Sequence, residues 1–289
     1  MKIFILVPVF NRLEHTKKFL ESIRKQTLAS YLQMVVINDG STDGTAEYLK
    51  GQRDVLQIFG DGNLWWAGSI QEGLLNTQSQ WKPGDYVVFL NNDTWFDSDY
   101  IEQLVSAVRF HSNSAVGSTL YEVKPARRAV SLGPIININR VIVSDKLLSL
   151  SSGERENLKD IYKVDALSGR GTIFPVELLQ RCGLMRPRLL PHYFSDYEFS
   201  MRLAKTGVNL LVSTKAIIYS DPIYGNANVH SMGLWDYLFS IRSSSNIWSV
   251  FIFYALVGSP FQRLTAPFRV IYYRGCRFIF RKLRMQNQA

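Results

Sequence analysis

Residues 86–94 read YVVFLNNDT, an apolar run that stops abruptly at three polar residues. A run of β-branched and aromatic residues predicts a strand buried on both faces, as in a parallel sheet. Ligands of open α/β sheets bind outside the carboxyl ends of the strands, so Asn91, Asn92 and Asp93 mark a candidate site. The structural alternative is an Asx turn, in which these side chains bond their own backbone.

The chain before residue 86 repeats this pattern of a buried strand followed by a polar turn. Strands are predicted at 2–9 and 34–37, and a third unit runs from Leu56 into a glycine-rich loop and a helix. Further helices are predicted at 14–26, after a cap at Thr42 or Asp43, and at 99–110. Because strands alternate with helices, we expect an α/β fold with a mainly parallel, doubly wound sheet.

Beyond about residue 118 the pattern loosens. Residues 131–145 predict strand and loop, and 151–160 predict a mobile polar excursion. A strand then leads into Phe174, with a helix from Pro175, and a loop feeds a second helix that ends at Gly207. Residues 208–221 predict a pair of strands, and 222–233 predict a loop rich in glycine and asparagine.

Composition places the chain among ordinary globular proteins, with 46% hydrophobic and 20% charged residues over 289 positions. Cys182 and Cys276 lie far apart without metal-ligand spacing, which indicates reduced thiols in a cytosolic setting. The apolar start of the chain is short, contains Pro8 and lacks a cleavage site, so it predicts a first strand and not a signal peptide.

Four segments in order resemble the family 2 glycosyltransferases of the GT-A fold: VPVFNR at 7–12, NDGSTDGT at 38–45, NND at 91–93 and SDYEFSMRLAKTG at 195–207. The resemblance covers roughly residues 1–235. It implies transfer of a sugar from a nucleotide-diphosphate donor to a hydroxyl group, with inversion. It also implies a nucleotide-sugar-binding half at 1–117, an acceptor-binding and catalytic half at 118–235, and a separate basic tail at 236–289.

In proteins that look like this, the first segment forms the base pocket, so the resemblance places Pro8, Phe10, Asn11 and Arg12 there. Asp39 would accept a hydrogen bond from the nucleobase imide. The alternative for Asp39, and more so for Asp43, is plain helix capping.

Residues 61–69 are similar to the donor-side loop of the family, with Asn63 and the backbone near Gly68 approaching the nucleotide-sugar. Of the adjacent tryptophans we expect one inside and one facing the ligand, and we assign Trp66 to the donor. Asn92 is assigned to the donor as well.

The metal motif of the family is Asp-x-Asp, which here reads Asn91-Asn92-Asp93, so its first acid is missing. Mg²⁺ or Mn²⁺ takes oxygen ligands and can obtain most of them from phosphate and water, so Asp93 alone remains a candidate ligand. His230 has the chain position of a late-loop histidine that reaches the metal or diphosphate in several GT-A enzymes. The alternative for His230 is a polar surface residue.

The family's catalytic base matches Asp196, which would draw the proton from the acceptor hydroxyl. Capping of the helix that begins near Tyr197 is its structural alternative. On the acceptor side the resemblance points to four residues: Arg170, His192, Tyr193 and Glu198. Arg170 is equally well explained as a surface arginine.

The tail carries most of the charge. No acid follows Asp236, whereas eight basic residues do, against a formal net charge of +9 for the whole chain. Apolar residues from Leu264 to Ile279 recur at helical spacing beside an arginine-rich face, which predicts amphipathic helices lying on an anionic membrane. The alternative is a carboxy-terminal helix packed on the core or on a second subunit. The excess of positive charge is concentrated in the tail and no nucleic-acid motif is present, so we expect no nucleic acid partner.

Together these patterns predict a metal-dependent glycosyltransferase of surface-polysaccharide assembly, in the cytoplasm at the inner face of the plasma membrane. The donor would be dTDP- or UDP-linked, with asparagine-containing metal motifs resembling those of rhamnosyltransferases, and the acceptor a glycolipid or growing glycan. Two rivals stay open. One is a nucleotide-sugar-binding pseudoenzyme, because an acid of the metal motif is lost; the other is a sugar nucleotidyltransferase, which would need a glycine-rich phosphate loop where this chain has FNRLEH.

Overall fold

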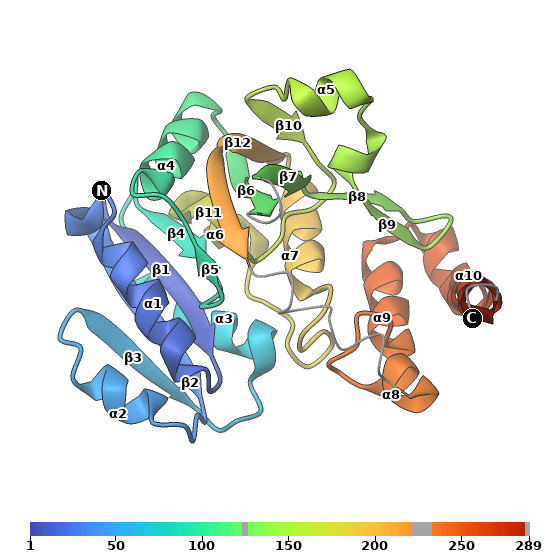
Figure 1. The fold of residues 1–289 in the computed structure, drawn as a ribbon, viewed down its shortest axis with the longest axis horizontal. Helices are drawn as coiled ribbons and strands as arrows, with labels where there is room; N and C mark the ends of the chain where they lie inside the picture. The colour runs from blue at the N-terminus through green and yellow to red at the C-terminus, as the bar shows by residue number, and fades with distance from the viewer. Residues whose placement is uncertain (123–126, 221–232, 287–289) are drawn as a thin grey trace.

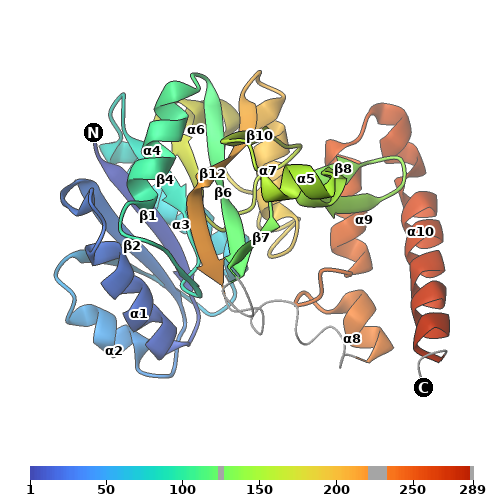
Figure 2. The ribbon, with the colours of Figure 1, turned by 45° about the horizontal axis from the view of Figure 1, so that its top comes forward.

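The computed structural model describes residues 1–122, 127–220 and 233–286, with side chains described as far as residue 273. A large twisted sheet flanked by helices makes up most of the molecule, and three helices at the carboxyl end stand beside it (Figures 1 and 2). His230 lies outside the described residues.

The first half of the chain alternates strand and helix as predicted. The strands are β1 (Ile3–Val9), β2 (Leu32–Asp39), β3 (Val55–Gly60), β4 (Tyr86–Phe89) and the short β5 (Thr94–Trp95). The helices are α1 (Leu13–Arg24), α2 (Thr45–Lys50), α3 (Trp65–Thr77) and α4 (Tyr100–Phe110), with 3₁₀ turns η1 (Ala29–Tyr31) and η2 (Gln78–Gln80). Strands β1 to β4 pair in parallel in the order β4-β1-β2-β3, which brings their carboxyl ends to one edge.

Both faces of this sheet are covered. Ile3, Ile5 and Val7 of β1 pack with α1 and α4, whereas the alternate residues Phe4 and Leu6 pack with the helices on the opposite face. Successive side chains of a strand point to opposite faces, so a continuous apolar run requires a helix layer on each side. The α/β fold with helices on both faces is therefore confirmed.

The second half completes the sheet with mixed strand directions. Its strands are β6 (Ser114–Glu122), β7 (Arg128–Ser131), β8 (Pro134–Asn137), β9 (Ile142–Asp145), β10 (Ile161–Lys163), β11 (Thr172–Pro175) and β12 (Asn209–Ser220). Its helices are η3 (Lys146–Ser149), α5 (Ser152–Glu156), α6 (Val176–Cys182) and α7 (Ser195–Ala204). Strand β11 lies between β4 and β6 and runs antiparallel to both.

Two local predictions are wrong. Residues 209–220 form one long strand with a register shift between Ser213 and Ile217, not a pair of strands, because the bulge absorbs the turn that Thr214 and Lys215 suggest. The polar stretch 151–160 is not only an excursion: Ser151 and Glu154 form a reciprocal capping box that starts α5.

The carboxyl end forms α8 (Leu234–Phe239), α9 (Ile247–Val257) and the 27-residue α10 (Pro260–Gln286). Buried residues of α9, Val250, Phe253 and Val257, join a third apolar cluster with Leu190 and Phe194 of the loop before α7. Figure 2 shows α10 running alongside α9 at the edge of the molecule. Among the described residues, no helix combines the length and apolar character needed to cross a bilayer.

Candidate active site

The loops after β1 and β2 are bonded to each other at the carboxyl edge of the sheet. Asn11 and Arg12 adopt left-handed backbone conformations, with φ of 58° and 64°, which turn the chain sharply from β1 into α1. The backbone N–H of Asn11 donates to Ser41 Oγ at 2.8 Å, and Asn11 Oδ1 accepts from the Thr42 N–H at 2.9 Å. This turn leaves Phe10 48% exposed and Pro8 half-buried, so an open aromatic ring lies where the base pocket is predicted.

Asp43 joins the two helices that follow these loops. One of its oxygens accepts from the Leu13 N–H at the start of α1, and the other accepts from the Thr45 hydroxyl and N–H at the start of α2. Capping, the alternative weighed for Asp43, is therefore what its contacts show.

Asp39 ends β2 and organises the loop before α3. Its Oδ1 accepts from the N–H groups of Gly62 at 2.8 Å and Leu64 at 3.2 Å, and its Oδ2 accepts from the Trp65 N–H at 3.0 Å. The residue is only 5% exposed. A carboxylate has about four acceptor positions, so one on Oδ2 remains for a nucleobase imide.

The predicted donor loop divides into exposed and buried parts. Asn63 is exposed, with its N–H donated to Asp61, whereas Gly68 is buried inside α3, where an added Cβ would lie 3.2 Å from Leu64 Cβ. Gly68 thus permits close packing within the protein, and the structure does not bring it to an open surface.

Trp66 lies half-buried between the ends of β4 and of the loop before β11. Its indole Nε1–H donates to Asn91 Oδ1 at 3.0 Å, and its ring packs edge-on against Phe89. A Cβ on Gly169 would lie 1.9 Å from Trp66 Cζ2, so this position requires glycine. Trp65, in contrast, turns its ring towards His192, with ring centroids 5.8 Å apart.

The three polar residues after β4 have three different surroundings. Asn91 is bonded to Trp66, and Asn92 is 7% exposed, with its amide donating to Thr16 of α1 at 3.1 Å. Asn92 therefore links β4 to α1 and has little surface left for a ligand. Asp93 Oδ2 pairs with Arg12 at 3.2 Å, while its Oδ1 is buried with no hydrogen-bond partner.

Asp196 lies in the first turn of α7. Its Oδ2 accepts from the Gly169 N–H at 2.8 Å and its Oδ1 from the Tyr197 N–H at 2.9 Å. Burial raises the pKa of Asp196 from its ordinary 3.8 to about 6, although these two backbone bonds and the nearby Arg170 act in the opposite direction. A carboxyl group of this kind exchanges protons close to neutral pH.

The other predicted acceptor residues separate into two groups. Arg170 and Tyr193 lie close enough to interact electrostatically, and burial raises the pKa of Tyr193. Burial, followed by the charge of Arg242, lowers the pKa of His192 to about 4, so its ring is neutral at pH 7, and its Nδ1 is buried without a partner.

Glu198 does not join this group. It is buried on the other side of α7, paired with Arg202 at 3.0 Å and Arg186 at 3.1 Å. Residues two apart on a helix do not share a face, so Asp196 and Glu198 diverge. The assignment of Glu198 to the acceptor side therefore has no support in its contacts, which are those of an internal ion pair.

Two participants, Gly169 and Arg242, were missed from the sequence, and Asn91 was predicted there only as part of the metal motif. Asn91 holds Trp66, Gly169 connects Trp66 to Asp196, and Arg242 of the segment between α8 and α9 places its guanidinium 5.9 Å from the Trp65 ring centroid. Gly169 carries a general signal, since a glycine can mark a place where backbone and side chain approach closely. Arg242 has no signal in the sequence, because it lies 177 positions after Trp65 and the two residues come together only in the folded chain.

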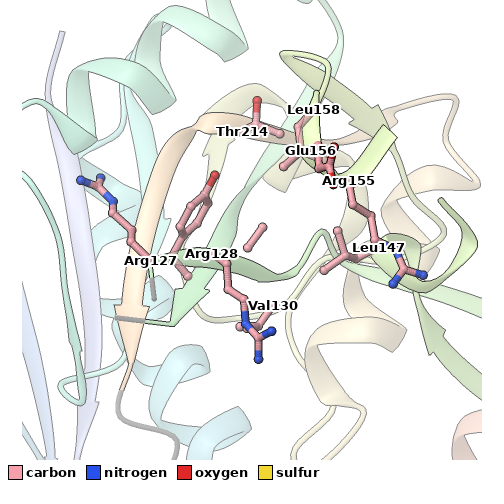
Figure 3. A pocket seen from close by; sticks show the side chains of 10 residues that line it. Arg127, Arg128, Val130, Leu147, Arg155, Glu156, Leu158 and Thr214 are labelled. Atoms are coloured by element: carbon pink, nitrogen blue, oxygen red, sulfur yellow. The ribbon is translucent and has the colours of Figure 1, made fainter. Parts of the chain in front are cut away.

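A hollow of about 660 Å³ opens beside β7, η3 and α5 (Figure 3). Its arginines have internal partners: Arg127 pairs with Asp97, Arg128 with Glu122, and Arg155 donates to the carbonyl groups of Leu148 and Leu150. None of the predicted site residues within the described ranges lines it.

Comparison with known proteins identifies the family. The family model described as glycosyl transferase family 2 matches residues 4–182, more than half of the chain. The chain belongs to glycosyl transferase family 2. The match covers the loops after β1, β2 and β4 of this family 2 chain, and ends before α7.

Curated relatives of this family 2 member are glycosyltransferases. Glycosyltransferase GlyA of Streptococcus pneumoniae serotype 4 is 34% identical over 121 residues, which are 40% of this chain and 16% of that protein. A cholesterol galactosyltransferase of Borreliella burgdorferi is 26% identical over 123 residues, 42% of this chain and 33% of that protein. The chain thus matches these relatives over a minor part of their lengths.

Solved structures show the same fold at low identity. GalNAc-T7 with UDP, GalNAc and Mn²⁺ superposes with a TM-score of 0.61 at 14% identity, covering 76% of this chain and 44% of that one. Staphylococcus aureus TarS superposes with a TM-score of 0.59 at 12% identity, covering 95% of this chain and 54% of that one. The family 2 chain therefore has the GT-A fold.

Proposed function

We propose that this glycosyltransferase transfers a sugar, with inversion, from a UDP- or dTDP-linked donor to a hydroxyl of a glycolipid or growing surface polysaccharide. Asp196 is the general base, and the nucleotide lies over the loops after β1 and β2. The asparagine-containing motif at 91–93 keeps dTDP-rhamnose first among the donors.

The observation that carries this proposal is the connection between the two halves of the site. Asn91 at the end of β4 bonds Trp66, Trp66 packs on Gly169, and the Gly169 N–H holds the Asp196 carboxylate. The predicted donor motif and the predicted base thus share one continuous set of contacts, although the sequence separates them by about a hundred residues.

In the proposed reaction Asp196 accepts one proton. As the acceptor oxygen attacks the anomeric carbon, its proton passes to Asp196, the bond from that carbon to the phosphate oxygen breaks, and the nucleoside diphosphate leaves. A base with a pKa of about 6 is deprotonated at pH 7 and still basic enough to assist. Neutral His192 and Tyr193, with Arg170, orient the acceptor hydroxyl beside it.

One carboxylate of this site, that of Asp93, is suited to bind a divalent cation. The buried, unpartnered Oδ1 of Asp93 is the kind of hard oxygen ligand that Mg²⁺ or Mn²⁺ prefers. The described residues contain no cluster of three or more histidine, cysteine or acidic side chains able to hold a metal, so most other ligands would come from the donor phosphates and water. Bound there, the ion would neutralise charge on the leaving diphosphate. His230 remains proposed as a second ligand.

The carboxyl end supports a membrane-peripheral position at the inner face of the plasma membrane. Five apolar side chains in the described part of α10 are each at least 64% exposed and form one stripe: Phe261, Leu264, Phe268, Ile271 and Tyr272. Their spacing of three, four, three and one residues keeps them on one side of the helix. A basic helix with such a stripe suits the interface of an anionic bilayer.

The test is a thermal-shift panel of UDP-, dTDP- and GDP-sugars, with and without Mn²⁺, on the wild type and on Asp93→Ala. A ligand that binds only the native state raises the melting temperature. We expect a shift for one donor that needs both Mn²⁺ and Asp93. Asp99→Ala, on the exposed start of α4, is the charge-matched control and should keep the shift.

A nucleotide-sugar-binding pseudoenzyme remains the second candidate, because Asn91 replaces an acid and its amide oxygen already accepts a hydrogen bond from Trp66. It predicts the same thermal shift without release of nucleoside diphosphate from any donor, over a broad acceptor panel. Turnover of a single donor that disappears in Asp196→Asn would exclude it. The absence of a shift with every donor would refute metal-dependent donor binding.

A further inference from the structure

A second hollow, of about 230 Å³, lies on the other side of α7, where the end of α9 and the start of α10 meet the body of the protein. Four basic residues line it: Arg186, Arg202, Lys205 and Arg263. The rest of its lining is Glu198, Leu256 and Val257. Three of the basic residues belong to the glycosyltransferase body, and Arg263 belongs to the first turn of α10.

The positive charge of this hollow exceeds what its one acid neutralises. Glu198 is 4% exposed, and both of its oxygens are occupied, by Arg202 Nε at 3.0 Å, by Arg202 Nη2 at 3.1 Å and by Arg186 Nη1 at 3.1 Å. Arg202 gives further N–H groups to the carbonyls of Cys182 and Leu184 and is largely satisfied. The charges of Lys205 and Arg263 have no carboxylate partner in the described part of the chain.

Lys205 and Arg263 also have a structural task at the end of α9. Lys205 Nζ donates to the Val257 carbonyl at 3.3 Å, and Arg263 donates to the carbonyls of Gly258 at 2.9 Å and Leu256 at 3.4 Å. These bonds satisfy carbonyl groups that the last turn of a helix leaves open. An ammonium has three N–H donors and a guanidinium five, so most donors of both residues are still without a protein acceptor.

We propose that this hollow binds a phosphate group. Several cations with unused donors around one small space match the charge and the many acceptor oxygens of phosphate, and arginine pairs with phosphate in a bidentate manner. The Arg186 side chain is 41% exposed and pairs with Glu198 through one nitrogen, so further N–H donors of its guanidinium remain for a phosphate. Binding relieves the mutual repulsion of the four cations.

Two sources supply such a group: the head group of an anionic phospholipid, or a free phosphate. Position favours the lipid, because α10 starts at the hollow and carries the exposed apolar stripe described above. Among the described residues that line the hollow, none has a role in the proposed sugar transfer, because Glu198 belongs to an internal ion pair, so the phosphate site does not depend on that reaction.

The test compares the double variant Arg186→Gln/Lys205→Gln with the wild type and with a control of equal charge change, Lys163→Gln/Arg188→Gln, whose side chains are exposed and outside the hollow. Melting temperatures are measured in increasing sodium phosphate against sodium chloride of equal ionic strength. EDTA is present so that metal-dependent donor binding does not contribute. We expect a saturating rise of melting temperature in the wild type and control, and an apparent Kd weakened by at least about tenfold in the double variant, since charge-assisted hydrogen bonds are lost.

A second arm identifies the source. Cosedimentation is measured with vesicles of phosphatidylcholine alone and of phosphatidylcholine with phosphatidylglycerol. Weaker binding of the double variant than of the control to the anionic vesicles assigns the hollow to a lipid head group. Equal vesicle binding with a lost phosphate shift assigns it to free phosphate. If the double variant and its control agree in both arms, or the wild type responds in neither, the phosphate site is overturned.

Discussion

Replacing Asp196 with asparagine tests the proposed base most directly. The amide keeps the shape of the side chain but cannot take a proton at neutral pH. General-base assistance is worth about 10²–10⁴-fold, so we expect kcat to fall by that factor, or about 3–5 kcal/mol of barrier. The rate of the wild type should rise with pH through an apparent pKa of about 6 and level off above it, because only the deprotonated carboxylate is active. That acidic limb should vanish in Asp196→Asn.

The same substitution has a calculable effect on stability. The pKa of Asp196 is raised in the folded state, so between about pH 4 and 6 the folded protein holds a proton that the unfolded chain releases. The free energy of unfolding therefore falls by about 3 kcal/mol as pH rises through this window, because the pKa of Asp196 is about 6 in the folded protein and 3.8 ordinarily. Asparagine removes this cost but turns an NH₂ group towards one of the two backbone N–H donors, which costs about 1–3 kcal/mol. The net change at pH 7 should lie between about zero and 2 kcal/mol of added stability.

The assay is release of nucleoside diphosphate between pH 5 and 8.5, with the donor found by thermal shift, alongside urea unfolding at the same pH values. Asp160→Asn, an exposed carboxylate paired with Lys215, is the control and should alter neither profile. An acidic limb that persists in Asp196→Asn, or a loss of rate smaller than tenfold, would show that another group removes the proton. A large loss of stability would instead show that Asp196 mainly caps α7.

Two substitutions test the surroundings of the base. Gly169→Ala should displace Trp66, because the new Cβ would lie 1.9 Å from its ring, and should lower both kcat and, by about 1–3 kcal/mol, the free energy of unfolding. The control Gly153→Ala, with no atom within 4 Å of its Cβ, should be neutral or slightly stabilising. Unchanged activity in Gly169→Ala would refute the connection from Asn91 to Asp196. Phe253 is fully buried, with its ring stacked 5.0 Å from that of Phe194, so Phe253→Ala should lower the free energy of unfolding in urea by about 3–5 kcal/mol and should lower kcat. Phe261 is 68% exposed, so Phe261→Ala should leave both quantities unchanged in the absence of membranes.

The first half of the fold could be predicted because its signals are local. The apolar runs of β1, β2 and β4 are continuous, each ends at a polar turn, and a helix pattern follows. The insertion of β11 between β4 and β6 could not be predicted, since antiparallel pairing of distant segments leaves no mark on either one. The long β12 was divided in two because a bulge and a turn have the same residue signature.

The site was predictable to a similar degree. Asp39 and Asp93 lie at or just after strand ends and Asp196 lies in the first turn of a helix, so local patterns are enough to select them as candidates, and their roles stay predictions. Helical periodicity alone separates Asp196 from Glu198, so the divergence of these two side chains could have been predicted from the sequence. The contacts of Trp66 with Asn91 and Gly169, and of Arg242 with Trp65, depend on tertiary structure and had no counterpart in spacing.

The stack of Phe253 on Phe194 changes what the carboxyl-terminal helices can do. Phe194 takes a left-handed conformation, with φ of 68°, directly before the helix that carries Asp196. A membrane anchor joined by a loose linker would only keep an enzyme near the bilayer. If the carboxyl-terminal helices bind a membrane as proposed, their contact with this residue would also fix the height and tilt of α7 above the lipid surface. The proposed base would then reach acceptor hydroxyls at one depth only, and not those nearer to or farther from the membrane.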